Sequence, residues 1–172
     1  MAIQIAAAFG AKTFATASAA NAGYVASLGA VPIDYRAKSV DGYVAEHTLG
    51  EGFDIVYDAV GGRVLDASSQ AVKRFGHVVS ALGWGTHALA PLSFKGGTYS
   101  GVFTLLPLLT GVGREHHGEI LREATRLADS GQLKPRINSQ TYTLDTANDA
   151  HCALAGSATT SGKVVITINA QE

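Results

Sequence analysis

The sequence lacks several features that mark particular classes of protein. Its single cysteine, Cys152, has no partner for an internal disulfide, and its start shows no secretory pattern. The 13 lysines and arginines form no run or basic patch, which argues against a nucleic-acid surface. The apolar runs are too short to span a membrane. We therefore predict a cytoplasmic protein that binds neither nucleic acid nor membranes.

Motifs of several enzyme classes are also missing. We find no P-loop, no GxSxG turn and no paired-carboxylate pattern. His116 and His117 are neighbours, but adjacent helix positions point about 100° apart, and the segment does not match HExxH. No cysteine cluster exists. We therefore predict no metal site and no zinc, and we interpret the two histidines as the polar start of a helix.

What the sequence does contain is enough apolar material for a packed core and a regular alternation of elements. Apolar residues make up 47% of the chain and charged residues 16%. The apolar periodicity predicts helices at 2–9, 19–28, 40–48, 64–73, 115–130 and 147–154. It predicts strands at 13–18, 31–35, 53–58, 76–82, 98–103, 136–144 and 163–168. We expect a loop at 84–97 and a buried or interface segment at 105–109.

This alternation predicts an α/β fold: a Rossmann-like, doubly wound, mainly parallel sheet with helices on both faces. A dinucleotide-binding βαβ unit needs a strand and a glycine-rich turn before its first helix, and neither precedes the helix that begins at Ala2. In the strand order 3-2-1-4-5-6 that strand is central. We therefore expect one of three outcomes: another chain supplies the strand, the sheet closes over the gap, or the sequence is a truncated product.

Four groups of segments carry a resemblance to a known family. They are AIQIA and FGAK within 2–12, LGA and IDYR within 28–36, FDIVYDAVGG at 53–62, and a final group of GQLKP at 131–135, YTL at 142–144, AH at 150–151 and GKVVI at 162–166. Their order and spacing resemble the cofactor-binding half of the medium-chain dehydrogenases/reductases, nearest to the zinc-independent quinone oxidoreductase branch. The resemblance implies a Rossmann domain for a nicotinamide cofactor, usually NADPH. It also implies a separate N-terminal domain that supplies much of the substrate pocket.

Candidate residues for the adenosine end of the cofactor follow the first two predicted strands. NAD enzymes place a carboxylate at the end of the strand that corresponds to 13–18 here, where it binds the ribose 2′-hydroxyl. In this chain the residues from Ser18 to Asn21 include no carboxylate that would repel a 2′-phosphate, which favours NADP(H). Tyr35 and Arg36 match a pair that borders the adenosine phosphate in the resembling family. The alternative interpretations are that Ser18 is a helix N-cap and that Arg36 is a solvated loop charge.

Candidate residues for the nicotinamide end follow later strands, at the carboxyl edge where ligands bind open α/β sheets. One group, Ala59, Val60 and Gly61, ends the strand at 53–58, and its structural alternative is a tight strand-to-helix turn. A second group, Leu82, Gly83 and Trp84, ends the strand at 76–82, and the alternative for Trp84 is an aromatic core or interface residue. The third group, Ser100, Gly101 and Val102, resembles the segment whose backbone binds the carboxamide, and its alternative is a dimer edge.

We therefore predict that residues 1–172 form a truncated NAD(P)-binding domain with the C-terminal helix and strand of the parent enzyme. The expected function is NADPH-dependent hydride transfer to a quinone, enone or similar carbonyl acceptor, or the cofactor-binding part of such an enzyme. The alternative is a non-catalytic nucleotide-binding or dimerisation module. We assign no catalytic residue. The expected partners are a small-molecule acceptor and a second copy of the chain, which pairs through 98–103.

Overall fold

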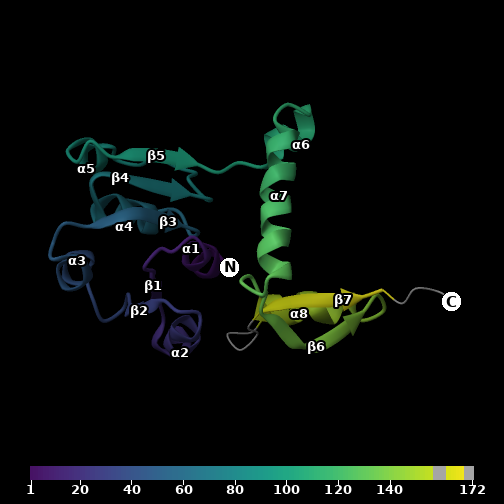
Figure 1. Cartoon of the computed structure of the whole chain (residues 1–172). Coiled ribbons are helices and arrows are strands. Elements are labelled where there is room, and N and C mark those ends of the chain that lie inside the picture. The colour runs from purple at the N-terminus through teal and green to yellow at the C-terminus, as the bar shows by residue number, and fades with distance from the viewer. Residues whose placement is uncertain (157–161, 169–172) are drawn as a thin grey trace. The chain divides into compact units, whose positions relative to one another are not determined.

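A computed structural model describes residues 1–156 and 162–168 (Figure 1). The chain forms two compact units: residues 12–121 make one, and residues 1–11 with 122–172 make the other. Each unit is described by itself. The prediction of a single truncated domain over 1–172 stays a prediction.

The unit of residues 12–121 contains two parallel sheets. The first pairs β1 (Phe14–Ala17) with β2 (Val31–Asp34). The second has the order β3-β4-β5 and consists of Phe53–Asp58, Val72–Ser80 and Thr98–Gly101. The helices of this unit include α2 (Ala19–Ser27), α3 (Val40–Thr48), α4 (Arg63–Ala71), α5 (Ala90–Ser93) and α6 (Leu105–Thr110). The predicted α/β class with parallel strands is confirmed.

The two sheets are not hydrogen-bonded to each other within the described residues. β1 pairs only with β2, and β3 pairs only with β4. This break falls at the position that the strand order 3-2-1-4-5-6 gives to the central strand. The sheet therefore does not close over the gap, which removes one of the three expected outcomes.

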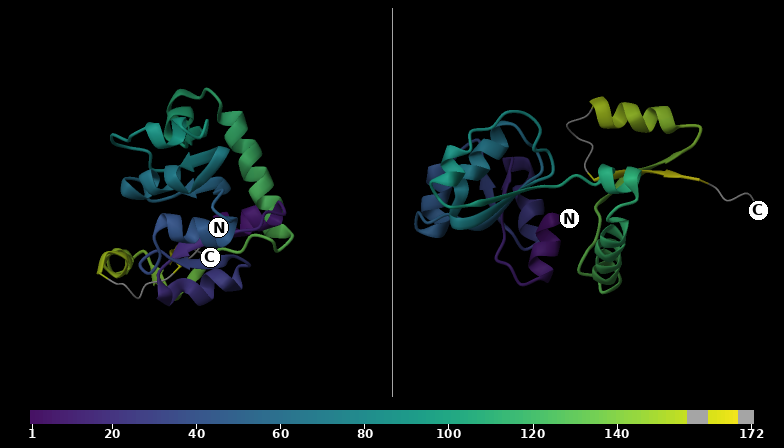
Figure 2. Two further views of the ribbon diagram at one scale, coloured as in Figure 1. Left: turned by 90° about the vertical axis from the view of Figure 1, so that its left-hand side faces the viewer. Right: turned by 90° about the horizontal axis from the view of Figure 1, so that it is seen from above.

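Side chains rather than backbone hydrogen bonds hold these sheets together. The rings of Phe14 and Phe53, which open β1 and β3, lie 5.3 Å apart. Both pack on a buried cluster of Ile33, Tyr43, Val44 and Ala71. A second cluster joins the three-stranded sheet to α4 and α5, where Leu65, Val72, Val78 and Leu92 are buried. α4 packs against both β3 and β4 (Figure 2).

The other unit pairs β6 (Ile137–Thr143) in parallel with β7 (Lys163–Thr167). It also contains α1 (Ala2–Ala8) and α8 (Ala147–Gly156), and the boundary between the units falls within α7 (Arg114–Asp129). The Gln4 side chain connects α1 to the segment before β6: its Oε1 accepts from the Lys134 N–H at 2.7 Å, and its Nε2 donates to the Lys134 carbonyl at 3.0 Å. Leu127, Leu133, Tyr142 and Ala150 are buried.

The structure corrects three sequence predictions. Val72 and Lys73 begin β4 instead of ending a helix, because buried Val72 pairs with Phe53 of the neighbouring strand. The expected loop at 84–97 contains the short helix α5. Residues 105–109 lie in α6 (Leu105–Thr110), which has no buried residue, so the buried interpretation is wrong, while the interface interpretation stays a prediction.

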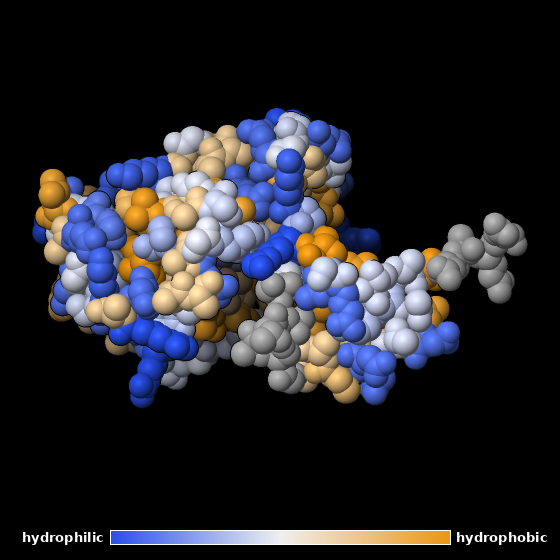
Figure 3. Space-filling model, turned by 90° about the horizontal axis from the view of Figure 1, so that it is seen from below, coloured by the Kyte–Doolittle hydropathy of each residue, from blue (hydrophilic) through white to orange (hydrophobic). Residues whose placement is uncertain are grey.

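No helix in the described part of the chain is both long enough and apolar enough to cross a membrane. In the view drawn in Figure 3, hydrophobic and hydrophilic residues lie interspersed in small groups.

Candidate functional site

Three strands end on one line at the carboxyl edge of the three-stranded sheet. The register pairs Asp58, the last residue of β3, with Ser80, the last of β4, and pairs Ser80 with Gly101, the last of β5. Ligands of open α/β sheets bind outside the carboxyl ends of the strands. The sheet therefore brings together all three groups predicted for the nicotinamide end.

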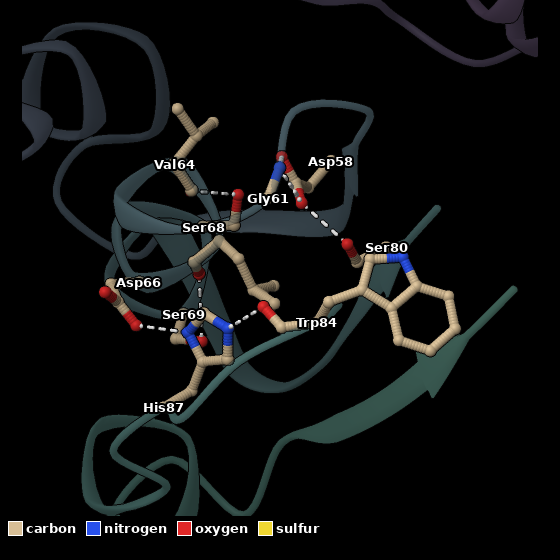
Figure 4. Close-up of polar contacts among 10 residues, drawn as sticks. Asp58, Gly61, Val64, Asp66, Ser68, Ser69, Ser80, Trp84 and His87 are labelled. Carbon is tan, nitrogen blue, oxygen red and sulfur yellow. Dashed lines mark hydrogen bonds and ion pairs between the residues drawn. The ribbon is translucent and has the colours of Figure 1, made fainter. Parts of the chain in front are cut away.

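A buried polar pair connects two of these strand ends. Asp58 and Ser80 are 2% and 0% exposed. The Asp58 carboxylate accepts from the Val60 N–H at 3.0 Å, from the Gly61 N–H at 3.1 and 3.0 Å, and from the Ser80 hydroxyl at 2.7 Å. Ser80 Oγ in turn accepts from the Leu82 N–H at 3.1 Å. The turns after β3 and β4 thus share one hydrogen-bonded pair (Figure 4).

The glycine at position 61 is required by both its backbone and its surroundings. Its φ is +76°, in the left-handed region that side chains disfavour. A Cβ there would overlap the carbonyl oxygen of Leu82. The absence of a side chain lets the turn after β3 lie directly against the turn after β4.

The loop after β4 is held against the first turn of α4. His87 Nδ1 lies 2.8 Å from a carboxylate oxygen of Asp66, and its Nε2 lies 3.4 Å from the Trp84 carbonyl (Figure 4). The hydrogen bond with Asp66 raises the pKa of His87 above its ordinary value of 6.5. Trp84 itself is exposed, and its ring meets that of Phe103 edge-on at 5.4 Å.

The third segment has its own polar contact. His77 Nε2 on β4 lies 2.8 Å from Ser100 Oγ on β5. The Val102 N–H donates to the Ser80 carbonyl at 2.8 Å, so the chain continues the ladder beyond Gly101. Ser100, Gly101 and Val102 therefore lie beside the strand that bears Ser80.

The adenosine-end candidates lie at the ends of the other sheet. Ser18 occupies the N-cap position of α2 without capping a backbone N–H, and its Oγ accepts from Asn21 Nδ2 at 3.2 Å. Tyr35 and Arg36 follow β2 and are exposed; the Arg36 guanidinium lies over the Tyr35 ring at 5.6 Å. The two pairs follow strand ends that lie opposite each other, at Ala17 and Asp34, but no hydrogen bond or ion pair among the described residues joins them. They supply hydroxyls, an amide and one positive charge, without a carboxylate at the end of β1.

Sequence reasoning missed Asp58, Ser80, Asp66, His77 and His87. An aspartate that ends a buried strand just before Gly61-Gly62 was the available signal for Asp58. It also missed that residues 83–88, Gly-Trp-Gly-Thr-His-Ala, have the spacing of a dinucleotide-binding turn after a strand. However, His87 of that segment is engaged with Asp66, and α5 that follows spans only Ala90–Ser93. We therefore do not assign this segment as a phosphate site.

The described residues fit two parts of a nicotinamide dinucleotide. The turns that contain Gly61, Leu82 and Gly83 are candidates for the nicotinamide end, and Ser18 with Arg36 are candidates for the adenosine end. For the pyrophosphate, no glycine-rich turn lies among the residues before β1. No group of three or more His, Cys, Asp or Glu in the described part of the chain is placed to hold a metal ion.

Comparisons with known proteins agree with this geometry. Residues 28–166 match a family model described as zinc-binding dehydrogenase. The chain belongs to this dehydrogenase family. It is 35% identical to the quinone oxidoreductase of Salmonella typhimurium over 96% of its length and 52% of that protein. The predicted place in the medium-chain dehydrogenase/reductase superfamily, near its quinone oxidoreductases, is confirmed.

Solved structures extend the likeness to the fold of this dehydrogenase chain. An alcohol dehydrogenase superfamily protein from Novosphingobium aromaticivorans shares 54% identity with a TM-score of 0.91, covering 98% of this chain and 52% of the other. A quinone oxidoreductase of Pseudomonas syringae pv. Tomato DC3000 shares 30% identity with a TM-score of 0.75, over 96% and 51%. The chain thus spans about half the length of these relatives and corresponds to their C-terminal half.

Proposed function

We propose that this chain is the cofactor-binding part of an NADPH-dependent oxidoreductase that reduces a quinone, an enone or a similar carbonyl compound. The observation that carries the proposal is the shared carboxyl edge of β3, β4 and β5, where three predicted cofactor segments meet around Asp58 and Ser80. When bound, the nicotinamide supplies the hydride. The residues of this edge orient its ring and sugar through backbone groups.

The preference for NADPH over NADH rests on the other sheet. A carboxylate at the end of β1 would repel a 2′-phosphate, and the chain from Ala17 to Asn21 has none. Arg36 is exposed next to Tyr35 and offers the positive charge that a phosphate needs.

Calorimetric titration of the chain with NADPH and NADH tests this proposal. We expect NADPH to bind about tenfold more tightly, and Arg36→Ala to abolish that difference while leaving NADH binding unchanged. The Arg74→Ala variant removes an exposed arginine from β4 and serves as the matched control. Failure of both nucleotides to bind would contradict the proposed function.

A second candidate is a non-catalytic nucleotide-binding or dimerisation module. It is favoured by the edges of β1 and β3 that have no hydrogen-bonded strand among the described residues. Under this alternative the chain binds NADPH but reduces no quinone when supplied with it. In a steady-state assay with a simple benzoquinone, NADPH-dependent turnover by the chain would exclude the non-catalytic module.

We also propose that a second copy of the chain pairs with the edge at 98–103. β5 has β4 on one side and no hydrogen-bonded strand on the other among the described residues, and such an edge is a template for pairing. Light scattering tests this: a dimer is expected, and a monomer at the highest soluble concentration contradicts it.

A further inference from the structure

We propose that the Asp58–Ser80 pair is the positioning element of the cofactor site: it fixes the turns after β3 and β4 relative to each other, so that both face the cofactor. The inference deepens the proposed function and rests on it for the identity of the ligand. The two residues are positioning residues, because the groups assigned to the ligand are the backbone of the turns.

The arrangement of donors around Asp58 is the first argument. Its Oδ1 accepts from Val60 and Gly61, and its Oδ2 accepts from Gly61 and from the Ser80 hydroxyl. Every group directed at the carboxylate is a donor. The ionised side chain satisfies all of them, because it only accepts hydrogen bonds.

The burial of the pair is the second argument. A buried carboxylate is costly unless it is paired or well hydrogen-bonded, and no ion pair to Asp58 is recorded among the described residues. An apolar residue would fill this position in the sheet without that cost. The presence of a carboxylate at this buried position is explained by the hydrogen bonds with which it holds the turn after β3.

The connection across the strands is the third argument. An aspartate that only shaped its own turn would need Val60 and Gly61 alone. Ser80 lies 22 positions away, and its hydroxyl donates to Asp58 while its oxygen accepts from Leu82 N–H. The Ala81 N–H also donates to the Asp58 carbonyl at 3.0 Å. A displacement of either turn is therefore transmitted to the other.

Two substitutions break the pair in different ways. Ser80→Ala removes the hydroxyl that joins the turns. Asp58→Asn keeps the shape of the side chain but replaces one carboxylate oxygen with an NH₂ group. That group faces hydrogen-bond donors which the replaced oxygen accepts from in the wild type. Ser68→Ala is the matched control, because Ser68 is also buried but its hydroxyl donates within α4, to the Val64 carbonyl at 2.8 Å.

Amide hydrogen exchange, followed by NMR on the uniformly labelled chain, is the first readout. We expect Ser80→Ala and Asp58→Asn each to speed exchange at both Gly61 and Leu82 at least tenfold, with Val56 and Val78 unchanged. Ser68→Ala should leave all four amides within twofold of the wild type. If Ser80→Ala affects Leu82 but not Gly61, the turns are independent and the proposal is overturned.

The second readout is the binding of NADPH, measured by the fluorescence of the nucleotide, whose emission reports how its ring is held. Both variants should weaken binding at least tenfold and lower the emission of the bound nucleotide, whereas Ser68→Ala should change neither. Unchanged binding in variants with faster exchange would overturn the positioning role. If the wild type itself binds no NADPH, the proposed function fails, while the exchange data still decide whether the pair couples the turns.

Discussion

The two sheets of the 12–121 unit carry the two halves of the candidate site, but they are built differently. In β3-β4-β5, three adjacent strands end together, and the buried Asp58–Ser80 pair connects the turns that follow. In β1-β2, the strands end in half-buried or exposed residues whose polar contacts are local: Asn21 to Ser18, and the Arg36 N–H to Asp34 at 2.9 Å. Only the first sheet has a site fixed by contacts between distant residues.

The difference shows what hydrogen-bonded neighbours add to a binding edge. A strand end is held in place by the strands on either side, and β4, which carries the buried Val72 and Val78, lies between β3 and β5. In the β1-β2 sheet each strand has a hydrogen-bonded neighbour on one side only among the described residues. We infer that the nicotinamide end is preformed and that the adenosine end is ordered when the cofactor binds.

The largest expected effect is on the core beneath the preformed edge. Leu65 of α4 is buried with Val72, Val78 and Leu92, so Leu65→Ala should lower the free energy of unfolding by about 2–5 kcal/mol. Val64→Ala, one position away and exposed, should change it by less than about 0.5 kcal/mol. Urea denaturation measures both, and equal effects would mean that the three-stranded sheet has no distinct core.

The next effect concerns the close approach of the two turns. Gly61→Ala combines a positive φ with overlap on the Leu82 carbonyl and should cost about 2 kcal/mol or more. Gly23→Ala, inside α2 with open space around its Cβ and no positive φ, should cost nothing. An equal loss for Gly23→Ala in the same denaturation experiment would refute this packing.

A smaller effect is expected outside the preformed edge. Leu49 ends α3 with φ +55° and is fully exposed, so it stores backbone strain without burying its side chain. Leu49→Gly should raise the free energy of unfolding by about 0.5–1 kcal/mol, since relief of strain exceeds the added entropy of the unfolded chain. Leu89→Gly, where φ is −80°, should not stabilise the protein.

The smallest effect is a pH dependence at the loop after β4. Because the pKa of His87 is raised by Asp66, the pair stabilises the fold fully below the unfolded pKa near 6.5 and loses this contribution as pH rises through the folded value. The thermal midpoint of the wild type should therefore fall relative to that of Asp66→Asn as pH rises above 6.5. Parallel curves would show that the pair does not hold this loop.

Local signals explain which parts of the fold were predicted. The predicted bounds of α3 and β3 match the structure, in which Ser39 caps α3 and a glycine precedes β3. The boundary between α4 and β4 was placed late, because Val72 and Lys73 continue a helical apolar pattern and only pairing with β3 makes them a strand. The break between β1 and β3 was expected from the strand order, and the structure shows it.

The candidate site was predictable only in part for a related reason. Gly61 and Leu82 were identified by their places at strand ends, and Gly101 by the resemblance of its segment to one that binds the carboxamide. The Asp58–Ser80 and Asp66–His87 contacts join residues 22 and 21 positions apart, and nothing in the local pattern pairs them. Which side chains hold the turns becomes visible only when the register of β3 and β4 is known.

We propose that the carboxyl edge of β3-β4-β5 receives the nicotinamide end of NADPH. Titration of the ¹⁵N-labelled chain with NADPH, followed by amide chemical shifts, tests it most directly. We predict that the amides of Gly61, Leu82, Gly83 and Gly101 shift together at saturation, while those of β6 and β7 do not. Saturable binding that leaves these four amides unshifted would contradict the claim.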